Sequence, residues 1–211
     1  MSLDLGQPVT SVEELREFIP EPHPHMKQKS IAVIDEVTRR FLASSTYFLL
    51  ATVGADGQLD VSPRGEKAGG VLVLDERHIA FGDRPGNRRI DSFQNIIERS
   101  RVGMLFLVPG YRETVRLNGR ATIVRNAPFL AELPGSRLEV DRENSPALAT
   151  IVEVEEMFLH CGQAPTRGGL WKPDTWPGSE NLPTVKEIFY SQSAYWPEPL
   201  PGVEKRVVPT T

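Results

Sequence analysis

Three consecutive polar residues have the types and the position needed to bind an anion. Asn87, Arg88 and Arg89 follow a Pro85-Gly86 pair. Proline presets φ at the first central position of a type II turn and glycine accepts positive φ at the second, so we expect that turn here. With Asn87 as the N-cap, both arginines would occupy the first turn of a helix, where the macrodipole favours negative charge. Free N–H groups and two guanidiniums together predict a phosphate site.

An amphipathic helix is predicted directly after this turn. Its apolar residues recur three and four positions apart and would pack on a core, at Ile90, Phe93, Ile96 and Ile97. The remaining positions would face water, at Asp91, Gln94, Asn95 and Glu98. A simpler interpretation of the two arginines is that they are solvated residues at the start of a surface helix, and the local motif alone leaves both interpretations open.

The elements that must position this turn are strands. Six segments have the length and composition of strands and fall into three hairpin-like pairs: Tyr47–Val53, Leu59–Pro63, Val71–Leu74, Ile79–Gly82, Val102–Val108 and Thr114–Val124. A seventh, residues 147–160, is longer. We expect a mainly β protein with flanking helices (α+β), built on an antiparallel barrel. Gly119 is expected to mark a bulge, and Glu153, Glu155 and Glu156 are expected on the solvated side of an edge strand.

The second predicted strand brings two more candidate residues together. Side chains alternate along a strand, so Leu59 and Val61 face one way while Asp60, Ser62 and Arg64 face the other. Ser62 and Arg64 should therefore emerge on the same face. The hairpin that follows this strand delivers the chain to the predicted turn.

The segment after Cys161 is rich in glycine, proline and tryptophan and has no clear period until a helix near residues 184–191. Trp171 beside Arg167 is equally consistent with covering a hydrophobic surface and with walling a flat anionic ligand. His160 and Cys161 do not form a nucleophile and base pair in our interpretation, because neighbours on a strand face opposite sides and the cysteine is expected to be a small buried residue.

Composition limits the classes of partner. The net charge of −4 has both signs interspersed over 211 residues, which favours neither a nucleic acid nor a membrane surface as partner. We see no transmembrane-length apolar run and no signal peptide, and the single cysteine cannot form an internal disulfide, so we expect a cytoplasmic protein. His23 and His25 lie in a proline-rich connector without further ligands, and we expect no metal site.

The ends of the chain are expected to flank one central domain. Thr10 and Ser11 precede Glu13 and Glu14 as capping boxes for a helix ending near Phe18. A second helix is predicted over residues 30–43. We divide the chain into an N-terminal helical extension (1–40), a barrel (41–162) and an irregular C-terminal segment with a helix that packs on the barrel (163–211).

Four segments in this order resemble the pyridoxamine 5′-phosphate oxidase-like flavoproteins, most closely their small bacterial FMN-dependent branch. They are Val61-Ser62-Pro63-Arg64-Gly65, Asp83 to Ser92, Val102 to Gly110, and Glu113 to Arg120. The branch also has a late His-Cys-Gly and a Leu-Trp, found here at His160 to Gly162 and at Leu170-Trp171. The resemblance spans roughly residues 41–177. It implies a split β-barrel homodimer with FMN at the subunit interface.

The resemblance also implies which residues contact the cofactor. Those at matching positions are Ser62, Arg64, Gly65, Phe81, Gly82, Asn87, Arg88, Arg89, Thr114, Arg167 and Trp171. Thr114 stands where the vitamin oxidases have glutamine, and the chain lacks their C-terminal Arg-Leu-His, so oxidation of pyridoxamine phosphate is not implied. Gln163 and Pro165 replace the lysine and aliphatic residue of relatives.

The function implied is FMN-dependent oxidoreduction, in which a hydride passes between the flavin and an unidentified small molecule. No catalytic acid or base is assigned. Two alternatives stay open: a relative that binds a deazaflavin or haem, and a flavin-binding sensor or storage protein without catalysis.

Overall fold

The computed structural model describes residues 4, 6–134 and 148–207. The chain divides into two compact units, residues 1–166 and 167–211, and each is described here by itself. The first unit contains the sheet and the candidate residues between positions 62 and 114. The finer division proposed from sequence, with boundaries at residues 40 and 162, stays a prediction.

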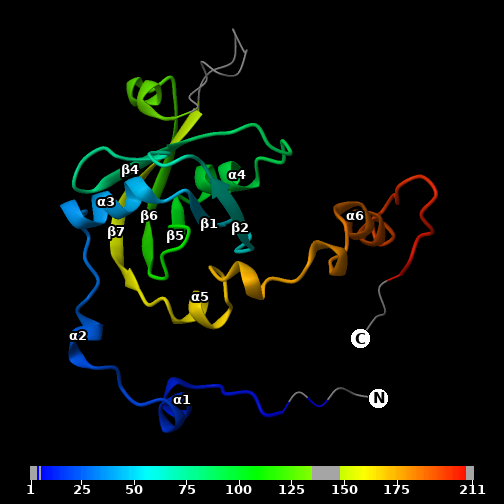
Figure 1. Cartoon of the computed structure of the whole chain (residues 1–211), viewed down its shortest axis with the longest axis horizontal. Helices are drawn as coiled ribbons and strands as arrows, with labels where there is room; N and C mark the ends of the chain where they lie inside the picture. The colour runs from blue at the N-terminus through cyan, green and yellow to red at the C-terminus, as the bar shows by residue number, and fades with distance from the viewer. Residues whose placement is uncertain (1–3, 5, 135–147, 208–211) are drawn as a thin grey trace. The chain divides into compact units, whose positions relative to one another are not determined.

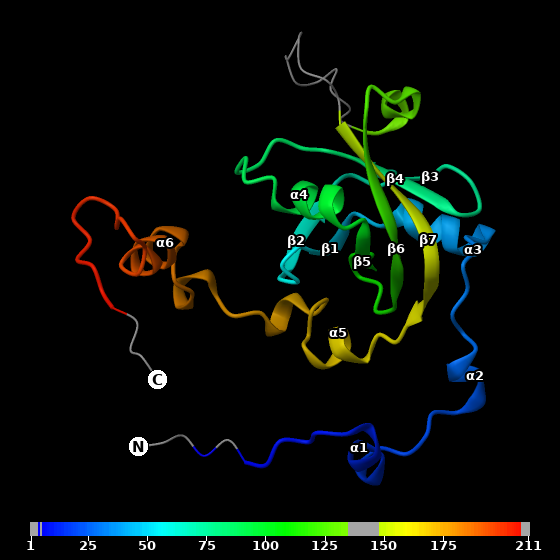
Figure 2. The ribbon, with the colours of Figure 1, turned by 180° about the vertical axis from the view of Figure 1, so that it is seen from behind.

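Seven antiparallel strands form one curled sheet in the part of the chain that the structure describes (Figures 1 and 2). Their order in the sheet is β2-β1-β5-β6-β7-β4-β3. All three predicted hairpins form, and β7 links two of them by pairing with both β6 and β4. The expected fold, an antiparallel split β-barrel with flanking helices, is confirmed. The strands are β1 (Tyr47–Val53), β2 (Leu59–Gly65), β3 (Val71–Val73), β4 (His78–Gly82), β5 (Arg101–Leu107), β6 (Thr114–Arg125) and β7 (Leu148–His160).

The predicted bulge lies in β6. The register between β6 and β7 shifts between Asn118 and Gly119. A Cβ atom at Gly119 would come within 2.0 Å of the Glu153 carbonyl oxygen, so only glycine allows the two strands this close. The bulge thereby bends the two longest strands of the sheet.

Aromatic rings fill the centre of the curled sheet. The Phe48 ring lies 5.0 Å from that of Phe81 and 5.1 Å from that of Phe106. All three side chains are buried, together with aliphatic residues from every strand except β2. This core joins β4 to β1 across the interior, although the two strands are not neighbours in the sheet.

Six residues at the start of the predicted second helix are not helical. The helix begins at Glu36 because the Asp35 side chain accepts a hydrogen bond from the Thr38 N–H at 2.7 Å and acts as the N-cap. Ile31 instead pairs with Met157 of β7 as a β-bridge. The helices of this unit are α1 (Val12–Phe18), α2 (Pro24–Lys27), α3 (Glu36–Ser44), α4 (Asp91–Glu98), a 3₁₀ turn (Pro128–Glu132) and α5 (Gln163–Arg167). The last residue of α5 belongs to the second unit.

The acidic residues of β7 do not lie on an edge strand, contrary to the expectation from sequence. β7 is an interior strand between β6 and β4. Glu155 pairs with Arg101 and Arg120, and Glu153 lies 2.9 Å from Arg77. These carboxylates therefore form ion pairs with arginines of β5, of β6 and of the turn before β4, an arrangement that sequence periodicity alone does not reveal.

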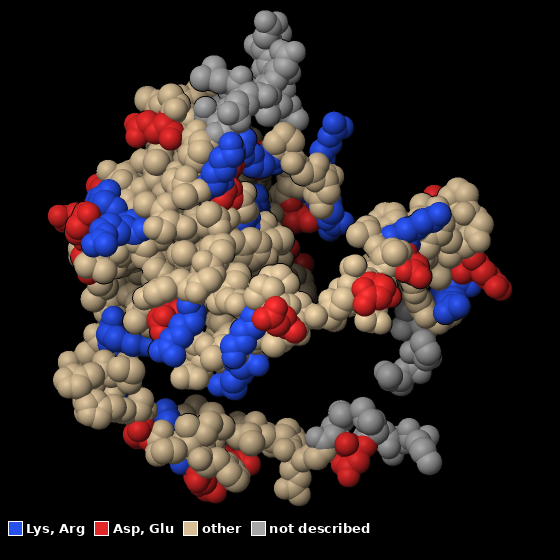
Figure 3. Space-filling model, in the orientation of Figure 1, with Lys and Arg blue, Asp and Glu red and all other residues tan. Residues whose placement is uncertain are grey.

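The C-terminal unit contains α6 (Val185–Ser193), which begins with a complete capping box between Thr184 and Glu187. The Phe189 ring packs edge-on against Trp196 at 5.0 Å. No described helix in either unit is long and apolar enough to cross a membrane. Lysine, arginine and acidic side chains alternate over the face shown in Figure 3.

Candidate functional site

The inner face of β2 presents three polar side chains, as the alternation of the sequence predicts. Asp60 is paired in register with Thr52, Ser62 with Leu50, and Arg64 with Phe48. Since partners in an antiparallel pair share a face and these three partners are buried, the polar side chains of β2 face the interior side of the sheet. Helix α4 covers them there, because it packs on both β1 and β2.

Arg64 has an unsatisfied hydrogen-bond donor. Its Nε atom is buried and has no hydrogen-bond partner among the described residues. Its Nη1 atom lies 4.0 Å from the Asp83 carboxylate, and the side chain is 25% exposed. Leaving a buried donor unpaired costs roughly 1–3 kcal/mol. A ligand that offers an acceptor beside Arg64 would remove this cost.

The turn that follows β4 differs from the predicted type II turn. Gly86 does not have positive φ; Arg88 has φ 65° and Ile90 has φ 55°. The side chain of Asn87 accepts a hydrogen bond from the Arg89 N–H at 3.0 Å, which folds this segment into an Asx-type turn. Asn87 is therefore not the N-cap.

Helix α4 begins at Asp91, and its N-cap, Ile90, makes no side-chain capping bond. Arg88 and Arg89 thus precede the helix instead of occupying its first turn. Positive φ at a non-glycine residue, especially a β-branched one, costs roughly 1–3 kcal/mol and is concentrated at functional sites. Two such residues in three positions mark this turn as a candidate ligand clamp.

The arginines of the turn differ in their partners. Arg89 donates from Nε to Asp91 at 2.8 Å, and this hydrogen bond raises the pKa of the guanidinium above its ordinary value, with the charges of Asp91 and Asp60 adding to the effect. Arg84 is held by Glu66 and by the Pro134 carbonyl. Arg88 is exposed and forms no ion pair with any residue that the structure describes. The turn therefore retains an open cation.

A hydrogen-bonded network connects β2 to α4 behind this turn. Ser62 and Ser92 hydroxyls lie 3.2 Å apart, and Ser92 donates to Asp60 at 3.1 Å. Asn95 donates to Thr52 at 2.9 Å. The expectation that Asn95 faces water is therefore wrong, because α4 turns it toward β1.

Phe81 and Gly82 lie at the end of β4. The Phe81 ring is part of the core, so only the backbone of this strand end is available to a ligand. Thr114, at the start of β6, is buried, and its hydroxyl donates to the His160 carbonyl at 3.5 Å. Gly65 pairs with Tyr47 at the same end of the sheet as Thr114.

Arg167 and Trp171 belong to the C-terminal unit. Arg167 is exposed, whereas the Nε1 atom of Trp171 is buried and has no acceptor among the described residues. Their predicted part in the site stays a prediction. Cys161 is exposed, so the expectation that it is a buried residue is wrong.

The structure thus brings Ser62 and Arg64 together with the turn that carries Asn87, Arg88 and Arg89. Three further residues of this region were not predicted as site residues: Asp60, Asp83 and Ser92. Asp60 could have been found from its position on the same strand face as Ser62 and Arg64. Asp83 and Ser92 carry no comparable signal, because their contacts to β2 cross 19 and 30 residues.

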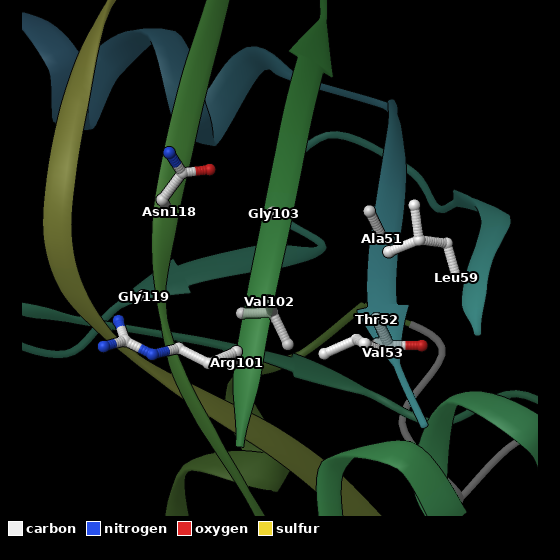
Figure 4. Close-up of a pocket in the computed structure, with 9 residues that line it drawn as sticks. All are labelled: Ala51, Thr52, Val53, Leu59, Arg101, Val102, Gly103, Asn118 and Gly119. Atoms are coloured by element: carbon white, nitrogen blue, oxygen red, sulfur yellow. The ribbon is translucent and has the colours of Figure 1, made fainter. Parts of the chain in front are cut away.

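The opposite face of the sheet carries a shallow hollow of about 270 Å³ (Figure 4). Gly103 lies at its centre, with Asn118 on one side and Ala51 and Leu59 on the other. A Cβ atom at Gly103 would lie 3.3 Å from the Asn118 Oδ1 atom, so the absent side chain creates the hollow. Leu59 and Val61 on this face are 80% and 59% exposed.

Several solved structures align with this chain over most of their own length. A putative pyridoxamine 5′-phosphate oxidase from Lactobacillus delbrueckii is 21% identical, with coverage of 61% of this chain and 95% of that one and a TM-score of 0.45. A conserved hypothetical protein from Mycobacterium tuberculosis is 18% identical, with coverage of 72% and 96% and a TM-score of 0.45. General stress protein 26 from Bacillus anthracis is 12% identical, with coverage of 57% and 88% and a TM-score of 0.44.

Comparison with curated proteins gives no match. The sequence profile of the pyridoxamine 5′-phosphate oxidase family, in contrast, matches residues 34–161, which include every strand of the sheet and the whole of the turn between β4 and α4. This match spans more than half of the chain and agrees with the resemblance found from the motifs. The chain therefore belongs to the pyridoxamine 5′-phosphate oxidase family.

Proposed function

We propose that this protein is an FMN-dependent oxidoreductase that exchanges a hydride between the flavin and a small organic molecule. The observation that carries the proposal is the unsatisfied Nε of Arg64, buried on the strand face that meets the arginine turn. A buried cationic donor without an acceptor fits a ligand with anionic or carbonyl oxygens. FMN has both kinds of oxygen. FMN is also the cofactor that the resemblance to the pyridoxamine 5′-phosphate oxidase-like flavoproteins implies, and the chain belongs to the pyridoxamine 5′-phosphate oxidase family.

The residues present fit the two ends of FMN. Arg88 and Arg89 would hold the phosphate, since both guanidiniums are exposed on a turn with positive φ at Arg88 and Ile90. Asp91 pairs with Arg89 and would have to share it with the phosphate. Arg64, Gly65 and Thr114 would bind the ring system at the end of the sheet.

The bound flavin supplies the redox chemistry, because its N5 atom accepts or donates a hydride. The chain supplies orientation: β2 and β6 are fixed by their sheet pairing, so Arg64 and Thr114 are held on rigid elements. We assign no proton transfer to a named residue of this chain.

We also propose that the protein acts as a homodimer that covers the outer sheet face. Leu59 and Val61 leave an apolar surface exposed there, and the hollow at Gly103 continues it onto β5. β5 adds Gly103 and Leu105 to this surface, and both are only partly buried in the single chain. A second copy of the chain would supply that cover through a two-fold interface.

The cofactor is tested by the visible spectrum and mass of the molecule that copurifies with the full chain. We expect absorption bands of an oxidised flavin and the mass of FMN. A bound deazaflavin or haem would contradict the proposal. So would a protein that is purified without a chromophore and stays colourless after incubation with FMN.

Catalysis is tested separately from binding. The FMN-loaded protein is photoreduced under nitrogen, and reoxidation is followed after adding menadione as a probe acceptor or air-saturated buffer. Faster reoxidation by the quinone supports an oxidoreductase. If bound flavin is reoxidised only by air, and at the rate of free reduced FMN, a sensor or storage protein is the better description.

A further inference from the structure

The hydrogen bonds behind Ser62 have a defined direction. A carboxylate only accepts, so Asp60 must accept from both hydroxyls that contact its Oδ2 atom, Ser92 at 3.1 Å and Thr52 at 3.5 Å. The Thr52 oxygen in turn accepts from the Asn95 amide at 2.9 Å. The donors are therefore arranged in one direction: Asn95 donates to Thr52, and Thr52 and Ser92 both donate to Asp60.

This direction determines what Ser62 can do. A serine hydroxyl has one proton, and that of Ser92 is already donated to Asp60. In the 3.2 Å contact between Ser62 and Ser92, Ser62 must then be the donor and Ser92 the acceptor. The Ser62 oxygen is left with acceptor lone pairs and no free proton.

We propose that Asp60 is a positioning residue that keeps Ser62 a hydrogen-bond acceptor, so that Ser62 binds a hydroxyl of the cofactor's ribityl chain and not its phosphate. This inference rests on the proposed binding of FMN. It divides the site into two parts: arginines that bind the anionic end and a serine that binds the neutral polyol next to it.

Burial and charge support this division. Ser92 and Thr52 are 5% and 2% exposed, so water does not compete for their protons. The negative charge of Asp60 lies behind Ser92 and disfavours a phosphate at Ser62, whereas a neutral hydroxyl experiences no such repulsion. The alternative is a purely structural network that fastens β2 to α4.

Three ligands separate these possibilities: FMN, riboflavin, which has the ribityl chain without phosphate, and lumichrome, which lacks both. We expect Ser62→Ala to weaken binding of FMN and riboflavin by the same factor, about 3- to 10-fold for one neutral hydrogen bond. Lumichrome binding should stay unchanged. Ser62→Thr keeps the hydroxyl and should restore most of the affinity.

Asp60→Asn tests the direction of the network. The asparagine amide can donate to Ser92, which frees the Ser62 proton and removes a negative charge. We therefore expect riboflavin binding to weaken about 3-fold or more and the preference for FMN over riboflavin to rise. A structural role alone would weaken all three ligands together. Thermal melting confirms that each variant is folded.

Several results would overturn the inference while leaving the proposed function intact. One is a loss of FMN affinity alone in Ser62→Ala, which would place Ser62 on the phosphate. Another is an equal loss for all three ligands, or no loss for any. If the wild-type protein bound neither FMN nor riboflavin, the proposed function would fail as well, and the two failures are therefore distinguishable.

Discussion

The two faces of β2 differ in every respect that matters for binding. On one face Asp60, Ser62 and Arg64 lie under α4 in a network of hydrogen bonds, with one buried donor unpaired. On the other face Leu59 and Val61 are exposed and have no cover in the monomer. In our proposal the polar face binds the cofactor and the apolar face binds a second copy of the chain. If both proposals hold, one strand links cofactor binding to assembly.

The largest expected effect comes from the apolar face. Leu59→Glu combined with Val61→Glu places two charges in the proposed interface, where unpaired buried charges are strongly unfavourable. We expect the mass measured by light scattering at micromolar concentration to fall from dimer to monomer.

The matched control is Val37→Glu on α3, because Val37 is also exposed but lies outside this face. It should leave the mass unchanged. A wild-type protein that is monomeric with FMN bound would remove the need for a partner and leave the apolar face of β2 unexplained.

On the polar side, Arg88→Ala or Arg89→Ala should weaken FMN binding about 10-fold or more. The basis is that a hydrogen bond to a charged group contributes roughly 1.5–3 kcal/mol. Flavin fluorescence titration measures the change.

Arg40→Ala on α3 is the control for these titrations, since Arg40 is exposed and forms no ion pair within the described ranges. Its titration should overlay the wild type. If the Arg88 and Arg89 variants do the same, both arginines are solvated surface residues, and the contrast between the two faces loses its functional meaning.

A smaller effect is expected from substituting Trp171. This substitution tests whether the Trp171 indole contacts the flavin ring. Aromatic contacts contribute about 0.5–1.5 kcal/mol beyond burial, so Trp171→Leu should weaken FMN binding only a few-fold. Bound-flavin emission should increase more clearly, because an indole stacked on the ring quenches it. Unchanged emission with a large fall in melting temperature would show that Trp171 only covers a core.

Sequence periodicity was sufficient for the strands and for the two faces of β2, because both depend on local alternation. Local chemistry likewise predicted the cap at Ser11. The position of β7 could not be predicted, since its pairing with β4 joins segments about 70 residues apart. An interior strand with charged residues therefore appeared to be an edge.

The turn shows a different limit of prediction. Pro85-Gly86 favoured a type II turn, but positive φ occurs at Arg88 and Ile90, where the side chains themselves oppose it. Such strain depends on the surrounding structure and leaves no local sequence signal. The assignment of these residues to an anion site stays a prediction, because it depends on their types and not on their exact backbone geometry.

The most direct test of the central claim compares the affinity of the full chain for FMN and for riboflavin, which differ only by the phosphate. Titrations at low and moderate salt should show that FMN binds at least 10-fold more tightly, because Arg88 and Arg89 recognise the phosphate. This preference should shrink in Arg88→Ala. Equal affinity of the wild-type protein for the two ligands would contradict the account, because the arginine turn would then not be a phosphate site.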